Sequence, residues 1–463
     1  QVLVVFLENC DSAEAAKQWL KTQRQQESTN HLDLHCVLFQ AQEITGVVEY
    51  NTNLFKPETV TRLIGHWQTL ITGIVHHPDH TISQLPLLTD AERHQLLVEW
   101  GSAEGNYPQV PVYQHIETHA AQRPEAIALR CQDQQLSYGE LNQRANQLAH
   151  YLTSLGMVAG DRVAVCVQPC LEIGVALLGI FKAGGIYVPL DPSHPPERLA
   201  SILEDTQAKI LLTQSALSQN LPTVQHAFCL DTDWATVQPF PSHNPSIVVD
   251  LDQSAYVIYT SGTTGKPKGV VASHRNLVNY ILATQDRFGF NTEDVMPSVA
   301  RYTFSIAMFE LLSPLVAGGT LVLLSREQVL DFDRMSKTLE QLTMLHTVPS
   351  LMQKLVSYIQ DRGLDLQRYR GIKHIFTGGD IVAPDLLETL KAVFQNANVY
   401  VLYGCSEVSS LCCSYPVPRD QVVTQSRVGR AFNNVQTRLY DPDQNLVPIG
   451  IPGEIYVSGA GVT

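Results

Sequence analysis

The sequence predicts an α/β protein whose helices cover mostly parallel sheets. Beyond Val110, strand-like runs alternate with helix-like runs, a rhythm that favours parallel strands joined by crossover helices. The chain has 463 residues, which is too long for one hydrophobic core and indicates two to four domains. Its apolar content of 44% and charged content of 16% are those of an ordinary globular enzyme.

The alternating region can be assigned from its hydrophobic runs. Short apolar runs predict strands at residues 161–167, 186–190, 210–213 and 255–258. Helices are predicted at residues 171–182 and 195–206, and the second begins with two prolines, which suit a helix N-terminus. The order of these elements is that of βα units in a parallel sheet.

The first part of the chain has a different pattern. Strand-like runs are expected at residues 2–7, 34–40 and 46–50, followed by an amphipathic helix near residues 57–75. A turn-rich connector then occupies residues 86–108. We therefore expect three parts, at residues 1–85, 86–108 and 109–463.

Charge and cysteine content limit the class of function. The formal net charge of −14 argues against a nucleic-acid partner, which normally requires a basic face. Nine cysteines without C-x-x-C pairs favour a reducing cytoplasm over a disulfide scaffold or a zinc site. No apolar run reaches membrane-spanning length, and the N-terminus resembles a cut inside a longer polypeptide. We expect a cytoplasmic protein with no membrane partner.

The most informative stretch is residues 259–269, Tyr-Thr-Ser-Gly-Thr-Thr-Gly-Lys-Pro-Lys-Gly. It follows a predicted buried strand and combines three glycines, two lysines and several hydroxyl side chains. Glycines let backbone N–H groups turn inward together, while hydroxyls and lysines add donors and positive charge. This composition predicts a loop that holds a polyphosphate. The spacing does not fit the Walker pattern G-x-x-x-x-G-K-[ST].

The loop resembles the phosphate loop of the adenylate-forming superfamily, which includes acyl-CoA synthetases, luciferases and the adenylation domains of nonribosomal peptide synthetases. Residues 136–141 and 171–192 match early motifs of the same family in order and spacing. The resemblance runs from about residue 110 to the end of the chain. It implies the family's large N-terminal subdomain, with mostly parallel sheets and a small β-barrel-like part, and it implies ATP and Mg²⁺ as cofactors. By this resemblance, Thr263 and Lys268 are catalytic, and the nucleotide is bound by Thr260, Ser261, Gly262, Thr263, Thr264, Gly265 and Lys266.

Two later motifs extend the resemblance. Tyr403-Gly404-Cys405-Ser406-Glu407 occupies the place of the family's Tyr-Gly-Pro-Thr-Glu. It implies that Tyr403 packs on adenine, that Ser406 holds phosphate and that Glu407 is catalytic and binds Mg²⁺, as a hard cation requires. Thr377-Gly378-Gly379-Asp380 matches the turn at which backbone approaches the adenine, so the last three residues, with Gly404, join the predicted nucleotide site.

The flanking regions resemble parts of a larger assembly. Residues 1–85 are similar to the C-terminal end of a condensation domain but lack its His-His-x-x-x-Asp motif, so we expect no catalysis there. The family's ribose-binding aspartate and C-terminal lid would lie beyond Thr463. We therefore expect a core without the lid, which binds ATP and substrate but adenylates slowly. The implied partners are a condensation domain and a peptidyl carrier domain bearing phosphopantetheine.

The substrate pocket can be carried over by spacing. Amino-acid-activating relatives place an aspartate after the phenylalanine of Phe-Asp-x-x-x-x-Glu, but here Ser305 follows Phe304. A serine cannot neutralise a buried ammonium. The substrate therefore lacks an α-ammonium, as a keto or hydroxy acid does, or another acid pairs with it, or the alignment slips by one helical turn. The predicted pocket residues are Ser305, Ile306, Phe309, His346, Phe376, Gly378, Leu402, Ser410 and Leu411.

Three functions remain open at this point. The first is ATP-dependent activation of an amino acid or related carboxylic acid as an acyl-adenylate, for loading onto a carrier-protein thiol. The second is a free-standing acyl- or aryl-CoA ligase with the same fold. The third is a nucleotide-binding regulator built on a degenerate ligase. The condensation-like segment favours the first, and the intact phosphate loop with Glu407 weighs against the third.

Overall fold

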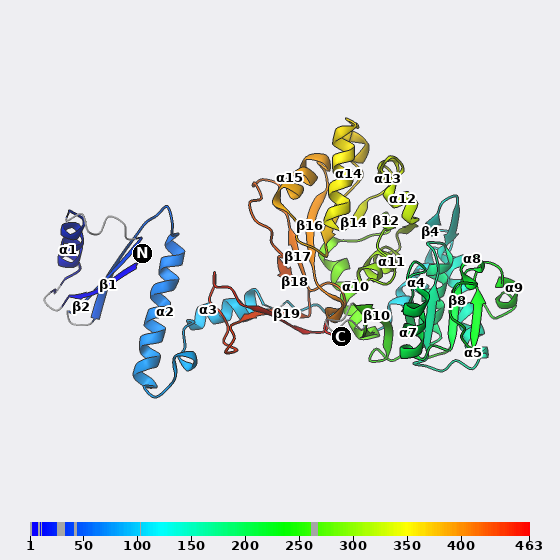
Figure 1. Cartoon of the computed structure of the whole chain (residues 1–463), viewed down its shortest axis with the longest axis horizontal. Coiled ribbons are helices and arrows are strands. Elements are labelled where there is room, and N and C mark those ends of the chain that lie inside the picture. Colours follow the sequence, from blue (N-terminus) through cyan, green and yellow to red (C-terminus); the bar gives the residue numbers. More distant parts are fainter. Residues whose placement is uncertain are drawn as a thin grey trace. The chain divides into compact units, whose positions relative to one another are not determined.

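A computed structural model of the chain describes residues 2–7, 10, 12–25, 33–40, 44–101, 103–260 and 267–463. It divides into two compact units (Figure 1). The first contains Gln1–Gln95 with Leu439–Glu454, and the second contains Leu96–Arg438 with Ile455–Thr463. These units are defined by how the residues pack. The domain limits expected from the sequence, at residues 1–85, 86–108 and 109–463, stay a prediction.

The first unit is built around a three-stranded sheet in the order β1-β2-β3. β1 is parallel to β2, and β2 is antiparallel to β3. The sheet and its helices match the elements predicted for this segment, with β3 beginning two residues earlier than expected. The elements are β1 (Val2–Leu7), α1 (Ala13–Gln25), β2 (Leu34–Gln40), β3 (Ile44–Tyr50), α2 (Pro57–His76), η1 (Ile82–Gln84) and α3 (Asp90–His94).

A buried polar contact joins α2 to α3 inside the first unit. The His66 imidazole contacts the Glu92 carboxylate, and the second oxygen of Glu92 accepts the backbone N–H of Ile449 at 3.2 Å. Asn445 also donates to the carbonyl of Ser83 at 3.0 Å. These bonds explain why residues 439–454, which are distant in sequence, pack with the first unit.

The second unit contains the predicted βα alternation. Its six-stranded sheet has the order β11-β10-β7-β6-β8-β9, and every neighbouring pair except β10 with β11 is parallel. The prediction of a mostly parallel sheet is confirmed. The strands are β6 (Arg162–Cys166), β7 (Ile186–Pro189), β8 (Ile210–Thr213), β9 (His226–Cys229), β10 (Ser254–Thr260) and β11 (Lys268–Ser273).

Two further sheets complete the α/β part of this unit. One has the order β12-β13-β4-β5 and the other β14-β15-β16-β17-β18, with parallel pairing from β14 to β16. Their strands are β4 (Ile127–Cys131), β5 (Gln134–Ser137), β12 (Val295–Ser298), β13 (Thr320–Leu323), β14 (Met344–Thr347), β15 (His374–Gly378), β16 (Asn398–Tyr403), β17 (Cys413–Pro416) and β18 (Arg430–Ala431). β19 (Val435–Tyr440) and β20 (Glu454–Gly459) form a separate two-stranded sheet where a small β-barrel-like part was expected, and no sheet among the described residues closes into a barrel.

Helices pack on these sheets because each presents one apolar face. In α7 that face carries the buried residues Leu199, Ile202 and Leu203. The helices of this part are η2 (Gln95–Glu99), α4 (Val112–Gln122), α5 (Tyr138–Ser154), α6 (Glu172–Lys182), α7 (Pro196–Thr206), α8 (Ser215–Ser218), α9 (Trp234–Val237), α10 (His274–Phe288), α11 (Ile306–Val316), α12 (Arg326–Leu330), α13 (Phe332–Leu339), α14 (Pro349–Asp361), η3 (Leu366–Tyr369), α15 (Pro384–Val393) and η4 (Ser406–Val408). Among the helices described, none is long and apolar enough to cross a membrane.

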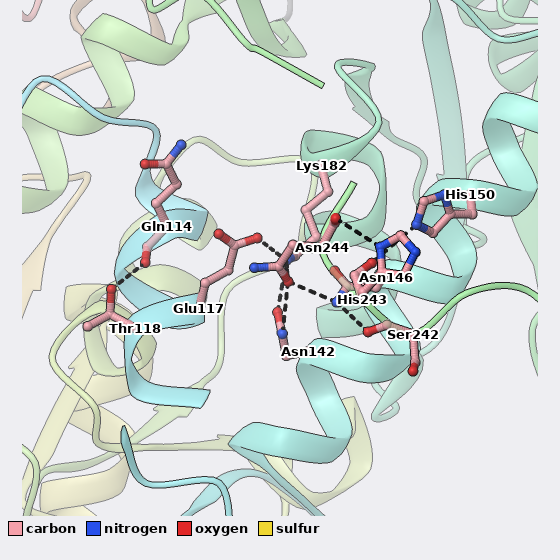
Figure 2. A network of polar contacts seen from close by, with 10 residues as sticks. All are labelled: Gln114, Glu117, Thr118, Asn142, Asn146, His150, Lys182, Ser242, His243 and Asn244. Atoms are coloured by element: carbon pink, nitrogen blue, oxygen red, sulfur yellow. Dashed lines mark hydrogen bonds and ion pairs between the residues drawn. The ribbon is translucent and has the colours of Figure 1, made fainter. Parts of the chain in front are cut away.

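A buried lysine cross-links the helices beside the six-stranded sheet (Figure 2). Lys182, at the end of α6, contacts the Glu117 carboxylate of α4 and donates to Asn142 of α5 at 2.8 Å. Asn244 accepts from the same ammonium at 3.4 Å, and Asn146 donates to Asn244 at 2.9 Å. Burial lowers the pKa of Lys182, and the contact with Glu117 opposes that shift. The network ties three helices to the segment before β10.

Candidate active site

The second unit contains a cavity of about 910 Å³ at the carboxyl ends of its parallel strands. Its walls come from the ends of β7, β10, β14, β15 and β16, together with the N-terminal residues of α7 and α11. Ligands of open α/β sheets bind at this edge, because the connecting loops gather there. The topology therefore assembles a site from residues far apart in sequence.

Most of the predicted substrate residues lie in this cavity. Seven of the nine line its walls: Ser305, Ile306, His346, Gly378, Leu402, Ser410 and Leu411. Phe309 and Phe376 are instead buried behind the wall, with their ring centroids 5.5 Å apart. Phe309 also packs edge-on to the His346 ring at 6.2 Å. These two aromatic residues thus support the pocket from behind.

The predicted nucleotide residues divide into three groups. Those that line the cavity are Thr260, Gly378, Gly379, Gly404, Ser406 and Glu407. Lys268, Asp380 and Tyr403 are exposed and are not among the lining residues. The remaining predicted residues lie outside the part of the chain that the structure describes: Ser261, Gly262, Thr263, Thr264, Gly265 and Lys266. Their roles stay a prediction.

The positions that flank the predicted phosphate loop are well defined. Thr260 ends β10 and is paired in register with Lys268, the first residue of β11. The Thr260 hydroxyl lies 3.5 Å from the carbonyl of Lys268. Because β10 is parallel to β7, Thr260 lies at the same sheet edge as the end of β7. The loop predicted from the sequence thus begins at the wall of the cavity.

Two glycines are required where backbone segments approach closely. A Cβ atom at Gly378 would lie 2.0 Å from the carbonyl oxygen of Leu402, on the adjacent strand β16. At Gly404 it would lie 2.1 Å from the carbonyl oxygen of Ser410. Any side chain at either position would displace the cavity wall. The Gly-Gly turn predicted from the sequence therefore has a direct steric reason.

Strained backbone lies directly beside Gly404. Ser409 and Ser410 have φ values of 54° and 85°, in the region that favours glycine. The Ser409 hydroxyl donates to the carbonyl of Gly461 at 2.9 Å, which helps to hold this turn. Strain of this kind persists where the surrounding structure enforces it, commonly at functional sites.

The cavity lining includes a buried carboxylate, Glu310, which sequence analysis did not assign. It is fully buried, and one oxygen accepts the backbone N–H groups of Val299 and Ala300 at 2.7 and 2.8 Å. The other oxygen accepts from Nδ1 of His346 at 2.7 Å. The carboxylate therefore fixes both the 299–300 loop and the orientation of His346. The sequence could have indicated this role, because Glu310 is the last residue of the motif Phe-Ser-Ile-Ala-Met-Phe-Glu at residues 304–310.

Two arginines and a histidine of the cavity lining were also missed. Arg198 and His194, from the segment around the start of α7, line the cavity together with Arg301. Arg301 pairs with Asp191 at 2.7 Å. Burial alone would raise the pKa of Asp191, but hydrogen bonds from Ser193 and the Arg301 guanidinium hold it below its usual value. By contrast, the buried Nε of Arg198 has no partner in the described chain.

The side chains of the cavity wall are compatible with a magnesium ion that takes most of its ligands from a bound nucleotide. Glu407 is exposed at the cavity wall, and its backbone carbonyl accepts both the N–H and the hydroxyl of Thr463, at 3.1 and 3.0 Å. No group of three or more metal-ligating side chains occurs among the described residues. Mg²⁺ characteristically takes one or two carboxylates and completes its shell with phosphates and water. A single carboxylate at Glu407 is consistent with that arrangement.

Fold and site together define an α/β protein with a large cavity at the carboxyl ends of its parallel strands. The family model described as AMP-binding enzyme matches residues 116–463, and the model described as Condensation domain matches residues 6–97. The chain belongs to the AMP-binding enzyme family and carries a fragment of a condensation domain before it. The predicted resemblance is confirmed.

Most of the chain is similar to segments of much longer curated proteins. The chain is 33% identical over 423 residues to tyrocidine synthase 3 of Brevibacillus parabrevis, covering 91% of this chain and 6% of that protein. It is 32% identical over 428 residues to malpinin synthetase of Mortierella alpina, covering 91% and 6% respectively. The chain therefore spans only a small part of these relatives.

Solved structures support the fold. A four-domain holo nonribosomal peptide synthetase bound to AMP and glycine matches with a TM-score of 0.80 and 27% identity, over 93% of this chain and 32% of that one. The nonribosomal peptide synthetase FmoA3 matches with a TM-score of 0.82 and 25% identity, over 93% and 46%. The predicted α/β fold class is confirmed.

Proposed function

We propose that this chain activates an amino acid or related carboxylic acid as an acyl-adenylate, using ATP and Mg²⁺, for transfer to a carrier-protein thiol in nonribosomal peptide synthesis. One observation carries the proposal. A single cavity joins Thr260, at the start of the predicted phosphate loop, to Glu407 and to an interior of apolar and hydroxyl side chains. Membership of the AMP-binding enzyme family supports the chemistry, and the peptide-synthetase relatives support the setting.

The reaction requires little acid–base chemistry from the protein. A substrate carboxylate oxygen forms a bond to the α-phosphorus of ATP, the bond to the bridging oxygen breaks, and pyrophosphate leaves with its electron pair. The carboxylate is already ionised at neutral pH, so no general base is needed. The protein contributes alignment and charge neutralisation, for which we assign Thr263, Lys268 and Glu407. Bound Mg²⁺ would neutralise phosphate charge.

The partners follow from the proposed setting. The acyl group would pass to phosphopantetheine on a peptidyl carrier domain, and a condensation domain would use the product. We assign adenylation to residues 109–463, a linker to residues 86–108, and no catalytic group to residues 1–85. The reducing cytoplasm suits the chain, since all nine cysteines are free.

Calorimetry of Mg²⁺–ATP binding tests the phosphate site. Changing Thr263→Ala together with Thr264→Ala should weaken binding at least about tenfold, because two hydroxyl bonds to a charged acceptor are lost. Thr338→Ala is the matched control, since the hydroxyl of this half-buried threonine on α13 bonds a carbonyl of its own helix and lies outside the cavity walls. Absence of ATP binding, or a double variant that binds like the control, would refute the placement.

Transfer to a carrier protein requires a separate test. In a protein extended through the family's lid, pyrophosphate exchange should depend on a carboxylic acid, and a holo carrier protein should accept the acyl group. Efficient transfer to free coenzyme A with none to the carrier protein would instead establish a CoA ligase. ATP binding without exchange for any acid would favour a regulatory protein.

A further inference from the structure

Few negative charges line the cavity. Two carboxylates line it in the described part of the chain, Glu310 and Glu407. Glu310 accepts three hydrogen bonds, from two backbone amides and from His346. Glu407 is exposed at the wall and is the carboxylate assigned above to the cation of ATP.

Nearby acids outside the lining are also engaged. Asp191 pairs with Arg301 at 2.7 Å. Asp380, next to the lining residue Gly379, is exposed, and its carboxylate accepts the backbone N–H of Ile381 at 2.7 Å. The interior therefore offers no free carboxylate from the residues that the structure describes.

Neutral hydrogen-bonding groups replace that charge. The buried Ser305 hydroxyl lies at the start of α11, 3.2 Å from the hydroxyl of Ser406. Thr347, at the end of β14, lines the cavity, and its buried hydroxyl has no partner within the described residues. Buried polar groups normally find a partner, so an unpartnered hydroxyl in a cavity wall points to a ligand group that bonds it. These hydroxyls can form hydrogen bonds with an uncharged oxygen of a bound ligand.

The charges of the lining residues disfavour binding of a positively charged ligand group. Arg198 lines the same cavity, and its buried Nε lacks a partner in the described chain. An ammonium group placed inside would lose its hydration, gain no free carboxylate and share the cavity with this guanidinium. Burying an unpaired charge is strongly unfavourable, whereas a hydroxyl or keto oxygen only requires a hydrogen bond.

We propose that the acid activated here carries no α-ammonium group and is an α-hydroxy or α-keto acid. The apolar lining residues Ile306, Leu402 and Leu411 favour an apolar side chain on that acid. This inference rests on the proposed function, because it concerns the acid bound in the same cavity. It narrows the substrate from amino acids and related acids to those whose α-substituent is neutral.

Binding of matched adenylate analogues tests the inference on the chain itself. The probes are two acyl-sulfamoyl adenosines, one carrying leucine and the other 2-hydroxyisocaproic acid, which differ only in the α-amino or α-hydroxy group. We expect the hydroxyacyl analogue to bind at least about tenfold more tightly, because burying an ammonium group without a carboxylate partner is strongly unfavourable. Tighter binding of the leucyl analogue would overturn the inference while leaving adenylation intact. Binding of neither analogue would count against the proposed function itself.

Matched variants at Ser305 identify the position responsible. Ser305→Asp should improve binding of the leucyl analogue relative to the hydroxyacyl analogue by about tenfold or more, because it adds the missing negative charge. Ser305→Asn is the control, since asparagine has the same size as aspartate and no charge, and it should leave the preference for the hydroxyacyl analogue in place. Equal effects of both variants would overturn the role of charge at this position. If Ser305→Asp does not fold, the preference of the unaltered chain still decides the substrate class.

Pyrophosphate exchange then separates the two neutral substituents. In the lid-extended protein, 2-hydroxyisocaproic acid, 2-oxoisocaproic acid and leucine share one side chain and differ only at the α-carbon. Exchange with either neutral acid above that with leucine supports the inference, and the better of the two identifies the substituent. Leucine giving the highest exchange would contradict it.

Discussion

His274 should make the second unit less stable in mild acid. This residue begins α10 and is almost fully buried, with its ring packed edge-on against Phe181 at a centroid distance of 5.1 Å. Its Nδ1 has no partner within the described residues. Burial disfavours the charged ring and lowers the pKa from 6.5 to about 4. The folded protein therefore resists taking up a proton that the unfolded chain accepts readily.

The sign and size of the effect follow from linkage. Between pH 6.5 and about 4 the unfolded chain binds more protons at His274, so the free energy of unfolding decreases as the pH falls through this window. Each pKa unit corresponds to about 1.4 kcal/mol, which gives a loss of about 2 kcal/mol between pH 8 and pH 5. The full contribution would approach about 3 kcal/mol near pH 4.

Urea unfolding at pH 8 and pH 5, followed by circular dichroism, measures this loss. His274→Phe keeps an aromatic ring against Phe181 but cannot take up a proton, so it should lose about 2 kcal/mol less between the two pH values. Other groups that titrate in this range, including His115 and His374, remain in both proteins and cancel in the difference. Equal losses in both proteins would refute the assigned role of His274.

Two further predictions concern the site and the scaffold. In the lid-extended protein, Glu407→Gln should lower adenylation by roughly 10²-fold or more, the scale of losing one positioned electrostatic group, and a loss below about twofold would contradict its role. Lys182→Met should lower the free energy of unfolding by about 3 kcal/mol, because Glu117 keeps a charge without its partner. Adding Glu117→Gln should recover part of this loss, whereas Lys337→Met, which breaks an exposed pair with Asp333, should cost less than about 1 kcal/mol. If Lys182→Met cost no more than Lys337→Met, the buried network would not be stabilising.

Sequence patterns located the elements of the second unit well. α7 and β8 lie within one residue of their predicted limits, because prolines mark the start of α7 and a short, mostly apolar run marks β8. By contrast, the packing of residues 439–454 with the first unit depends on single contacts such as that between Ile449 and Glu92. Nothing in local periodicity indicates such a long-range bond.

Site residues could be predicted from the sequence where a motif specified both the residue and the turn that carries it. Gly378 and Ser406 came from motifs that follow strands, and both line the cavity. Spacing alone could not distinguish a residue that lines a wall from one behind it, so Phe309 and Phe376 were grouped with the lining residues. Thr347 was missed because its position depends on which strands are neighbours in the sheet.

Sheet order also explains how one cavity is lined by residues from different sheets. β10 ends at Thr260 beside β7, and the segment after β7 brings Arg198 to the same edge. The five-stranded sheet contributes the separate wall that includes His346 and Leu402, at the ends of β14 and β16. The strands that flank the predicted phosphate loop and those that carry His346 and Leu402 therefore belong to different sheets. Ser305 lies 3.2 Å from the hydroxyl of Ser406 but on neither strand that flanks the predicted phosphate loop, so we expect Ser305→Asp to change the preferred acid without altering Thr260 or Lys268.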